Sequence, residues 1–131
     1  MNDRRMIAVL LLCLATAGCG PGGNEDTRQV ACTGYAAYFI GAALLRQLPE
    51  PFEAELARTM KLSPEVLGAR IQRDLVAGAA RHEAALEPSR VQRARQEGTE
   101  LAQQHIGGLD TRASARYLGA CLDTAARRNR S

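Results

Sequence analysis

Apolar residues recur at helical spacing along most of this chain, separated by charged and polar residues. In the middle of the chain, one face carries an aliphatic residue or alanine at every fourth position: Leu67, Ile71, Leu75 and Ala79. Ser63, Pro64 and Glu65 precede this run. They form a strong helix start, because serine can cap, proline suits the first helical position and glutamate suits the positive helix end. The pattern therefore predicts a helix from Pro64 to about Leu86.

Residues 28–48 are predicted to form a helix that is buried on several sides. Two stripes of apolar or small residues follow helical spacing, one of Cys32, Tyr35, Phe39 and Ala42 and another of Gly34, Ala37, Gly41 and Leu45. Stripes on more than one side indicate several neighbours. The apolar part, residues 30–45, is shorter than the roughly 20 residues of a membrane span. Pro49 and Pro51 end the helix.

The same kind of pattern predicts three further helices. A short amphipathic helix is expected over residues 52–60, a long one over 89–106 and a last one over 110–130. Ser89 is expected to cap the second of these and Asp110 to begin the third, because both residue types favour helix N-caps.

Gly107 and Gly108 are expected to end the long helix, because glycine readily takes the left-handed conformation found at helix C-termini. No stretch alternates with the period of a strand. We therefore predict an all-α fold, a small bundle of three to five helices over residues 28–131.

The N-terminus follows a different pattern, that of a bacterial export signal. Arginines at positions 4 and 5 precede residues 7–17, which carry no charge. A membrane span takes roughly 20 apolar residues, so this run is too short and suits a cleaved signal. Small residues then precede Cys19. We predict a signal peptide over residues 1–18 and, because residues 19–27 are rich in glycine and polar side chains, a flexible tether there.

Ala17, Gly18 and Cys19 resemble the cleavage site of bacterial lipoproteins, although Thr16 stands where an aliphatic residue is usual. The resemblance implies that the Cys19 sulfur receives a diacylglycerol, that the chain is cut just before it, and that the new amino group is acylated, for example with palmitate. In enteric bacteria an aspartate after the cysteine retains such proteins at the inner membrane. Because Gly20 is found here, the resemblance implies an outer-membrane protein facing the periplasm.

An ordinary secretory cleavage site is a second interpretation, since Ala15, Thr16 and Ala17 fit its small-x-small pattern. Cleavage there would release a soluble protein that begins at Gly18 and keeps an odd number of cysteines. Lipidation of Cys19 instead leaves a natural pair. We therefore favour the lipoprotein; a soluble secreted form and an uncleaved anchor stay open as alternatives.

Cys32 and Cys121 are predicted to form one structural disulfide. Both lie on apolar helical stripes, and export brings them into an oxidising compartment. Closing a loop of about 90 residues stabilises a fold by roughly 4 to 5 kcal/mol in the loop-entropy model. Neither cysteine belongs to a C-x-x-C motif, which argues against a redox-active pair.

The remaining polar residues form no recognised catalytic, metal or nucleic-acid signature. The net charge is +3 with both signs mixed along the chain, which argues against the basic stripe of a nucleic-acid-binding protein. His82 and His105 could meet between adjacent helices beside Glu83 or Glu100, but their spacing matches no metal motif. They are better interpreted as residues at the rim of the core. We expect no metal, no cofactor and no catalytic residue.

Cys32, Tyr35, Phe39, Ile40 and Gly41 lie in a stretch that resembles the first helix of small periplasmic helical proteins. These include immunity proteins against amidase effectors of type VI secretion. The resemblance is short, and it implies an exported, helical, disulfide-bonded protein without assigning any functional residue.

We therefore expect a cell-envelope lipoprotein, held to the membrane by its lipid, whose helical domain binds an envelope or secreted protein and is not an enzyme. Two alternatives stay open. One is an immunity or inhibitor protein against an envelope-acting hydrolase, and the other is an accessory structural component of an envelope assembly.

Overall fold

The computed structural model describes residues 21–45 and 47–130, and the regular structure in these ranges is entirely helical. The elements are α2 (Pro21–Leu44), α3 (Glu50–Thr59), α4 (Pro64–Arg70), the π-helical segment η2 (Ile71–Val76), α5 (Ala79–Ala84), α6 (Pro88–Gly107) and α7 (Thr111–Arg130). Because α4, η2 and α5 form one interrupted helix, these ranges contain five helices and no strand. The predicted all-α bundle of three to five helices is confirmed.

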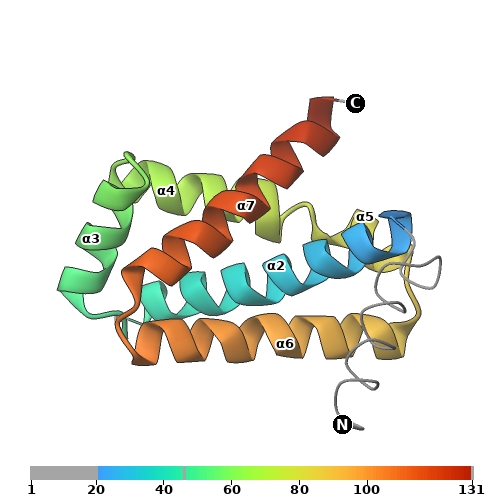
Figure 1. The fold of residues 1–131 in the computed structure, drawn as a ribbon, viewed down its shortest axis with the longest axis horizontal. Coiled ribbons are helices and arrows are strands. Elements are labelled where there is room, and N and C mark those ends of the chain that lie inside the picture. Colours follow the sequence, from blue (N-terminus) through green and yellow to red (C-terminus); the bar gives the residue numbers. More distant parts are fainter. Residues whose placement is uncertain (1–20, 46, 131) are drawn as a thin grey trace, which may run out of the picture.

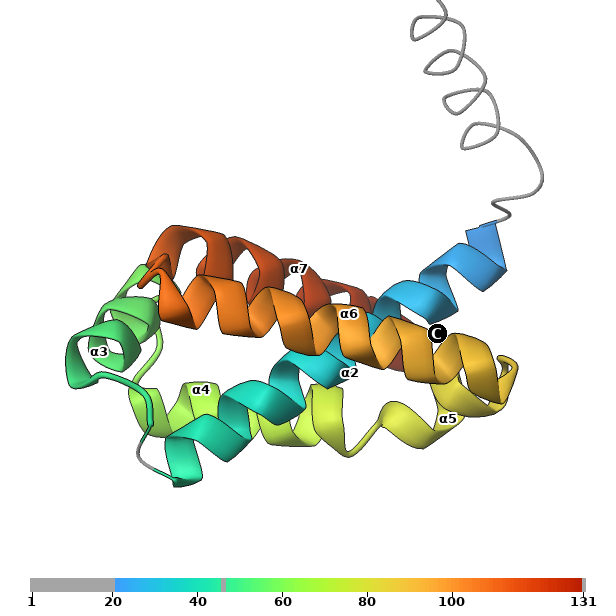
Figure 2. The same ribbon diagram turned by 90° about the horizontal axis from the view of Figure 1, so that it is seen from below.

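The long helices alternate in direction, and the short α3 lies at one end of the bundle (Figure 1). α2 and α6 run the same way, while the α4–α5 segment and α7 return in the opposite direction. The view turned by 90° shows α2 and α6 crossing at an angle (Figure 2). The order is that of an up-and-down four-helix bundle, with α3 inserted in the first connection.

α2 supplies the centre of the hydrophobic core. Its predicted stripe is buried along its whole length and packs against apolar residues of α3, α4, η2 and α7: Phe52, Leu56, Leu67, Ile71, Leu75, Leu118 and Leu122. The second predicted stripe is buried at Gly34, but Ala37 and Leu45 are exposed. The expectation of neighbours along that whole side is therefore wrong, because α6 crosses α2 at an angle and does not follow it (Figure 2).

The crossing of α2 and α6 is a backbone-to-backbone contact at two glycines. A Cβ atom at Gly98 would overlap the carbonyl oxygen of Ala31 and would lie 2.9 Å from the amide nitrogen of Tyr35. A Cβ atom at Gly34 would overlap the carbonyl oxygen of Arg95. Only glycine fits at either position, so these two residues set the distance between the helices.

A disulfide joins α2 to α7. The Cys32 and Cys121 sulfurs are 2.03 Å apart, the Cα atoms are 5.9 Å apart, and both side chains are buried. The predicted pairing is confirmed. Because the two cysteines are 89 residues apart in sequence, the bond links the first and last described helices of the domain.

α2 begins earlier than the sequence predicts. The tether expected over residues 19–27 is helical from Pro21 onward, so the flexible assignment is wrong for 21–27. Proline suits a first helical position, and the Asp26 carboxylate accepts a hydrogen bond of 2.7 Å from the Arg128 guanidinium in α7. This tertiary contact anchors a segment that composition alone marks as flexible. The predicted signal peptide 1–18 and lipid-accepting Cys19 lie outside the described residues.

The helix start signals hold at two positions and fail at one. The Ser63 hydroxyl accepts a hydrogen bond from the Val66 amide at 3.2 Å, and the Asp110 carboxylate accepts one from the Ala113 amide at 3.0 Å. The cap predicted at Ser89 is wrong, because α6 begins one residue earlier, at Pro88. The fixed φ of proline starts the helix there, which places Ser89 inside the first turn.

The helix predicted from Pro64 to about Leu86 is present but interrupted. Residues 71–76 have the wider π-helical turn, and the Ala77 amide donates to the Gln72 carbonyl at 2.9 Å, five residues back. The buried Thr33 hydroxyl of α2 lies 2.9 Å from the Gln29 carbonyl of its own helix and 3.3 Å from the Leu75 carbonyl, so its one proton is shared between them. The π-helical turn thus packs directly against α2.

The end of α6 is closed by a leucine, not by a glycine. Gly108 has a right-handed conformation with φ of −87°, and Leu109 has the left-handed one with φ of 54°. The Leu109 amide donates to the Ile106 carbonyl at 3.1 Å and the Asp110 amide to the His105 carbonyl at 2.8 Å, which is the Schellman pattern. The helix ends where the two glycines predict, but the left-handed residue is Leu109, one position after Gly108.

We predict that Gly98→Ala destabilises the protein by about 1 to 3 kcal/mol, because the new methyl group would force α2 and α6 apart. Gly41→Ala is the matched control, since a Cβ there meets nothing within 4 Å. Alanine at that helical position should raise stability by roughly 0.5 to 1 kcal/mol. Urea denaturation measures both free energies. Equal effects of the two substitutions would contradict the assigned role of the crossing.

Candidate functional site

The predicted site residues are distributed over separate parts of the bundle. Cys32 and Cys121 are buried in the disulfide and are not exposed to a substrate. His82 and His105 do not meet: His82 contacts Asp26 near the start of α2, while His105 contacts Tyr35 in the middle of that helix. Within residues 21–45 and 47–130, no three metal-ligating side chains gather at one place.

His82 belongs to a small cluster formed by α2, α5 and α7. Its Nδ1 is 3.9 Å from the Asp26 carboxylate, which is also the partner of Arg128. Burial and the positive charge of Arg128 lower the pKa of His82, and this outweighs the opposite effect of Asp26. Because the imidazole is mostly neutral at pH 7, the charge pair in this cluster is the one between Asp26 and Arg128.

A second cluster connects α2, α6 and α7 through the buried hydroxyl of Tyr35. This oxygen is 2.8 Å from Nδ1 of His105 and 2.7 Å from the Ser114 hydroxyl. The ring of Tyr117 stacks on that of Tyr35, with centroids 4.4 Å apart. Desolvation by burial is the main cause that raises the pKa of Tyr35 to about 12. The phenol therefore stays protonated and can act as a hydrogen-bond donor at physiological pH.

Two directions of hydrogen bonding satisfy this cluster with a neutral His105. Either Nδ1 of His105 accepts from Tyr35 while Ser114 donates to the Tyr35 oxygen, or Nδ1 donates to Tyr35 while Tyr35 donates to Ser114. Desolvation lowers the pKa of His105, against a smaller opposite effect of Asp110, which favours this neutral form. Ser114 and Tyr35 are fully buried, so the cluster joins three helices and offers no accessible nucleophile.

The sequence indicates one member of this cluster, Tyr35, but not its hydrogen-bond partners. Tyr35 lies on the buried stripe of α2, and a buried tyrosine hydroxyl usually finds a partner. Ser114 and His105 could not be named as the partners, because their placement depends on how α6 and α7 pack. His105, which the sequence places at the rim of the core, is half-buried.

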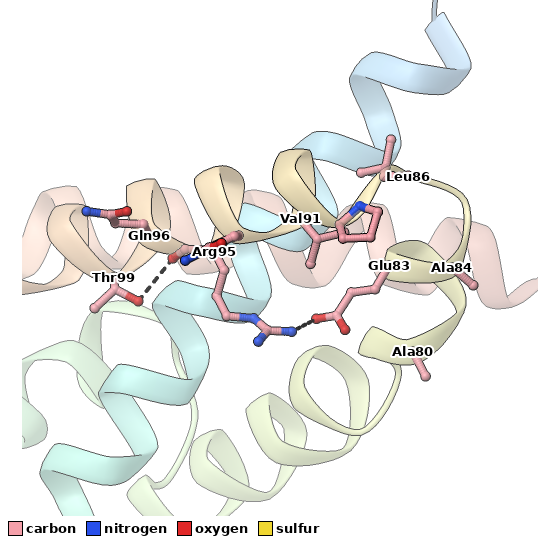
Figure 3. A pocket seen from close by; sticks show the side chains of 10 residues that line it. Ala80, Glu83, Ala84, Leu86, Val91, Arg95, Gln96 and Thr99 are labelled. Carbon is pink, nitrogen blue, oxygen red and sulfur yellow. Dashed lines mark hydrogen bonds and ion pairs between the residues drawn. The ribbon is translucent and has the colours of Figure 1, made fainter.

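A surface groove of about 880 Å³ lies between α5 and α6 (Figure 3). Its walls combine small or apolar residues with a few polar ones: Ala80, Glu83, Ala84, Leu86, Pro88, Val91, Gln92, Arg95, Gln96 and Thr99. Glu83 of α5 and Arg95 of α6 point toward each other and form an ion pair (Figure 3). The groove is open to solvent and offers an apolar surface with one charged pair.

Comparisons with protein-family models, with curated proteins and with solved structures found no match to this chain. Of the helices described in the structure, none combines the length and the apolar character needed to cross a membrane. Function must therefore be inferred from the residues and from the geometry of the bundle.

We predict that stability falls as the pH drops below the ordinary histidine pKa of 6.5. The unfolded chain takes up protons there, while the folded state resists because its histidine pKa values are lowered. His105→Asn keeps an uncharged acceptor for Tyr35 and should make the fall shallower. Urea denaturation between about pH 7.5 and 5 measures the slope. His82→Asn/His105→Asn should flatten it further; an unchanged slope in both variants would contradict this prediction.

Proposed function

We propose that this protein is a cell-envelope lipoprotein, attached to the outer membrane through Cys19, whose helical domain binds another protein on the periplasmic side. The observation that carries the proposal is the pairing of Cys32 with Cys121. A disulfide is typical of an exported protein. The Cys32–Cys121 bond also pairs every cysteine after the apolar N-terminal run except Cys19. The Cys19 thiol is therefore available for a lipid.

The groove between α5 and α6 supports binding as the activity of the domain. It presents Leu86, Pro88 and Val91 to solvent beside the Glu83–Arg95 ion pair. Apolar walls with a few polar groups are typical of surfaces that receive a helix or loop of a partner. The hydroxyls of Tyr35 and Ser114 are buried, so their cluster supports a structural role and gives no support for catalysis.

The inhibitor alternative receives no separate support from the geometry. Cys32, Tyr35 and Phe39, which carry the resemblance to immunity proteins, are all buried, so core packing accounts for their pattern. We therefore propose protein binding in its general form. The identity of the bound partner distinguishes the alternatives: a secreted hydrolase favours an inhibitor, and a large envelope assembly favours an accessory component.

Mass spectrometry of the mature N-terminus tests the anchor. We expect a chain that begins at Cys19 and carries diacylglycerol and a further acyl group, recovered from the membrane fraction. Cys19→Ser should abolish the lipid and release the protein from that fraction, whereas the Cys32–Cys121 bond should stay intact. An unmodified chain that begins at Gly18 would contradict the anchor.

Site-specific photo-crosslinking in the producing bacterium tests the binding surface. A photoreactive residue at Gln92, which lines the groove, should yield a discrete crosslinked product. The same residue at Gln103, which is exposed on α6 outside the groove, is the matched control and should not. Identical products from the two positions, or none from Gln92, would contradict binding through the groove.

A further inference from the structure

A second cleft lies between α7 and the α3–α4 region, on a part of the bundle separate from the groove between α5 and α6. These helices are neighbours in Figure 1. The cleft measures about 470 Å³ and is lined by polar and apolar residues of both sides: Thr59, Met60, Leu62, Arg70, Arg112, Ala115, Arg116, Gly119, Leu122 and Asp123. Three of these side chains are guanidinium groups, so positive charge gathers around one concave site.

Two of the three arginines have no acidic partner within the described ranges. Arg112 and Arg116 are four residues apart on one face of α7, and no carboxylate of residues 21–45 or 47–130 forms an ion pair with either. Arg70 reaches the cleft from α4, and its Nε is 4.0 Å from the Asp74 carboxylate. Asp74 is held more closely by Arg73, at 2.8 Å. The guanidinium groups of Arg112 and Arg116 are therefore available to bind an anion.

The lining of the cleft also includes apolar residues. Met60 and Leu62 come from the segment after α3, and Ala115 and Leu122 come from α7. At Gly119 a Cβ atom would meet nothing within 4 Å, so the absence of a side chain there leaves room. A volume of this size lies within the usual range of small-ligand sites, roughly 300 to 1,000 Å³. The site can therefore hold an apolar group beside an anion.

We propose that this cleft binds a carboxylate that adjoins an aliphatic group. Arginine guanidinium groups bind carboxylates through two parallel hydrogen bonds, and Arg112 and Arg116 can approach the anion from α7 while Arg70 approaches from α4. Asp123 in the lining leaves the three arginines in excess, and the apolar residues of the lining favour a carboxylate that carries an aliphatic group over inorganic phosphate, which has none. This inference does not depend on the lipid at Cys19.

Titration calorimetry on the purified mature protein tests the proposal with three probes. These are N-acetyl-Ala-Ala-Leu with a free carboxylate, the same peptide as its amide, and 4-methylpentanoate. We expect the free acid to bind and the amide to bind at least about tenfold more weakly, since one charge-assisted interaction is lost. Tighter binding of the peptide than of 4-methylpentanoate would indicate a peptide terminus, and equal binding would indicate a small acid.

Paired substitutions locate the binding. Arg112→Gln/Arg116→Gln should weaken the free acid by about tenfold or more. Arg90→Gln/Arg93→Gln, two exposed arginines of α6 outside the cleft, should leave binding unchanged. Gly119→Leu keeps all three arginines but fills the space, and it should also abolish binding. Thermal unfolding of each variant shows that the fold is kept.

Three results would overturn the proposal. The first is no heat of binding for the free acid, and the second is equal binding of acid and amide. The third is tighter binding of inorganic phosphate than of the carboxylates, which would make the cleft a phosphate site.

Discussion

The close contact of α2 and α6 at Gly34 and Gly98 is the constraint on which the rest of the bundle depends. With no side chain between them, the two backbones touch, and α2 becomes the central helix of the core. This closeness brings the Tyr35 hydroxyl within 2.8 Å of His105 on α6. The Cys32–Cys121 bond joins α7 to α2, and the Ser114 hydroxyl of α7 lies 2.7 Å from the same Tyr35 hydroxyl.

The helical content was predictable because the local signals agree with the final packing. Ser63 and Asp110 cap their helices as expected, and the buried stripe of α2 follows its 3.6-residue period. The disulfide was predictable because only one pair of cysteines remains once Cys13 is assigned to the cleaved signal and Cys19 to a lipid. These features depend on residues close in sequence or on the number of cysteines, and neither requires knowledge of how the helices pack.

The errors come from positions where tertiary contacts override local preference. Residues 21–27 have the composition of a flexible linker, but Asp26 pairs with Arg128, which is distant in sequence, and the helix extends. Leu109 takes the left-handed conformation although two glycines precede it. The cleft lined by Arg70, Arg112 and Arg116 was equally hidden, because nothing local in the chain indicates that α4 and α7 become neighbours.

The early start of α2 limits how far the domain can move. On the proposed attachment at Cys19, only two residue steps separate the lipid from Pro21, a reach of at most about 7 Å. α2 has 24 residues and is therefore about 36 Å long. The start of the bundle would therefore stay within a few ångströms of the bilayer surface. A partner would then have to arrive at the membrane surface, where encounters occur by two-dimensional diffusion.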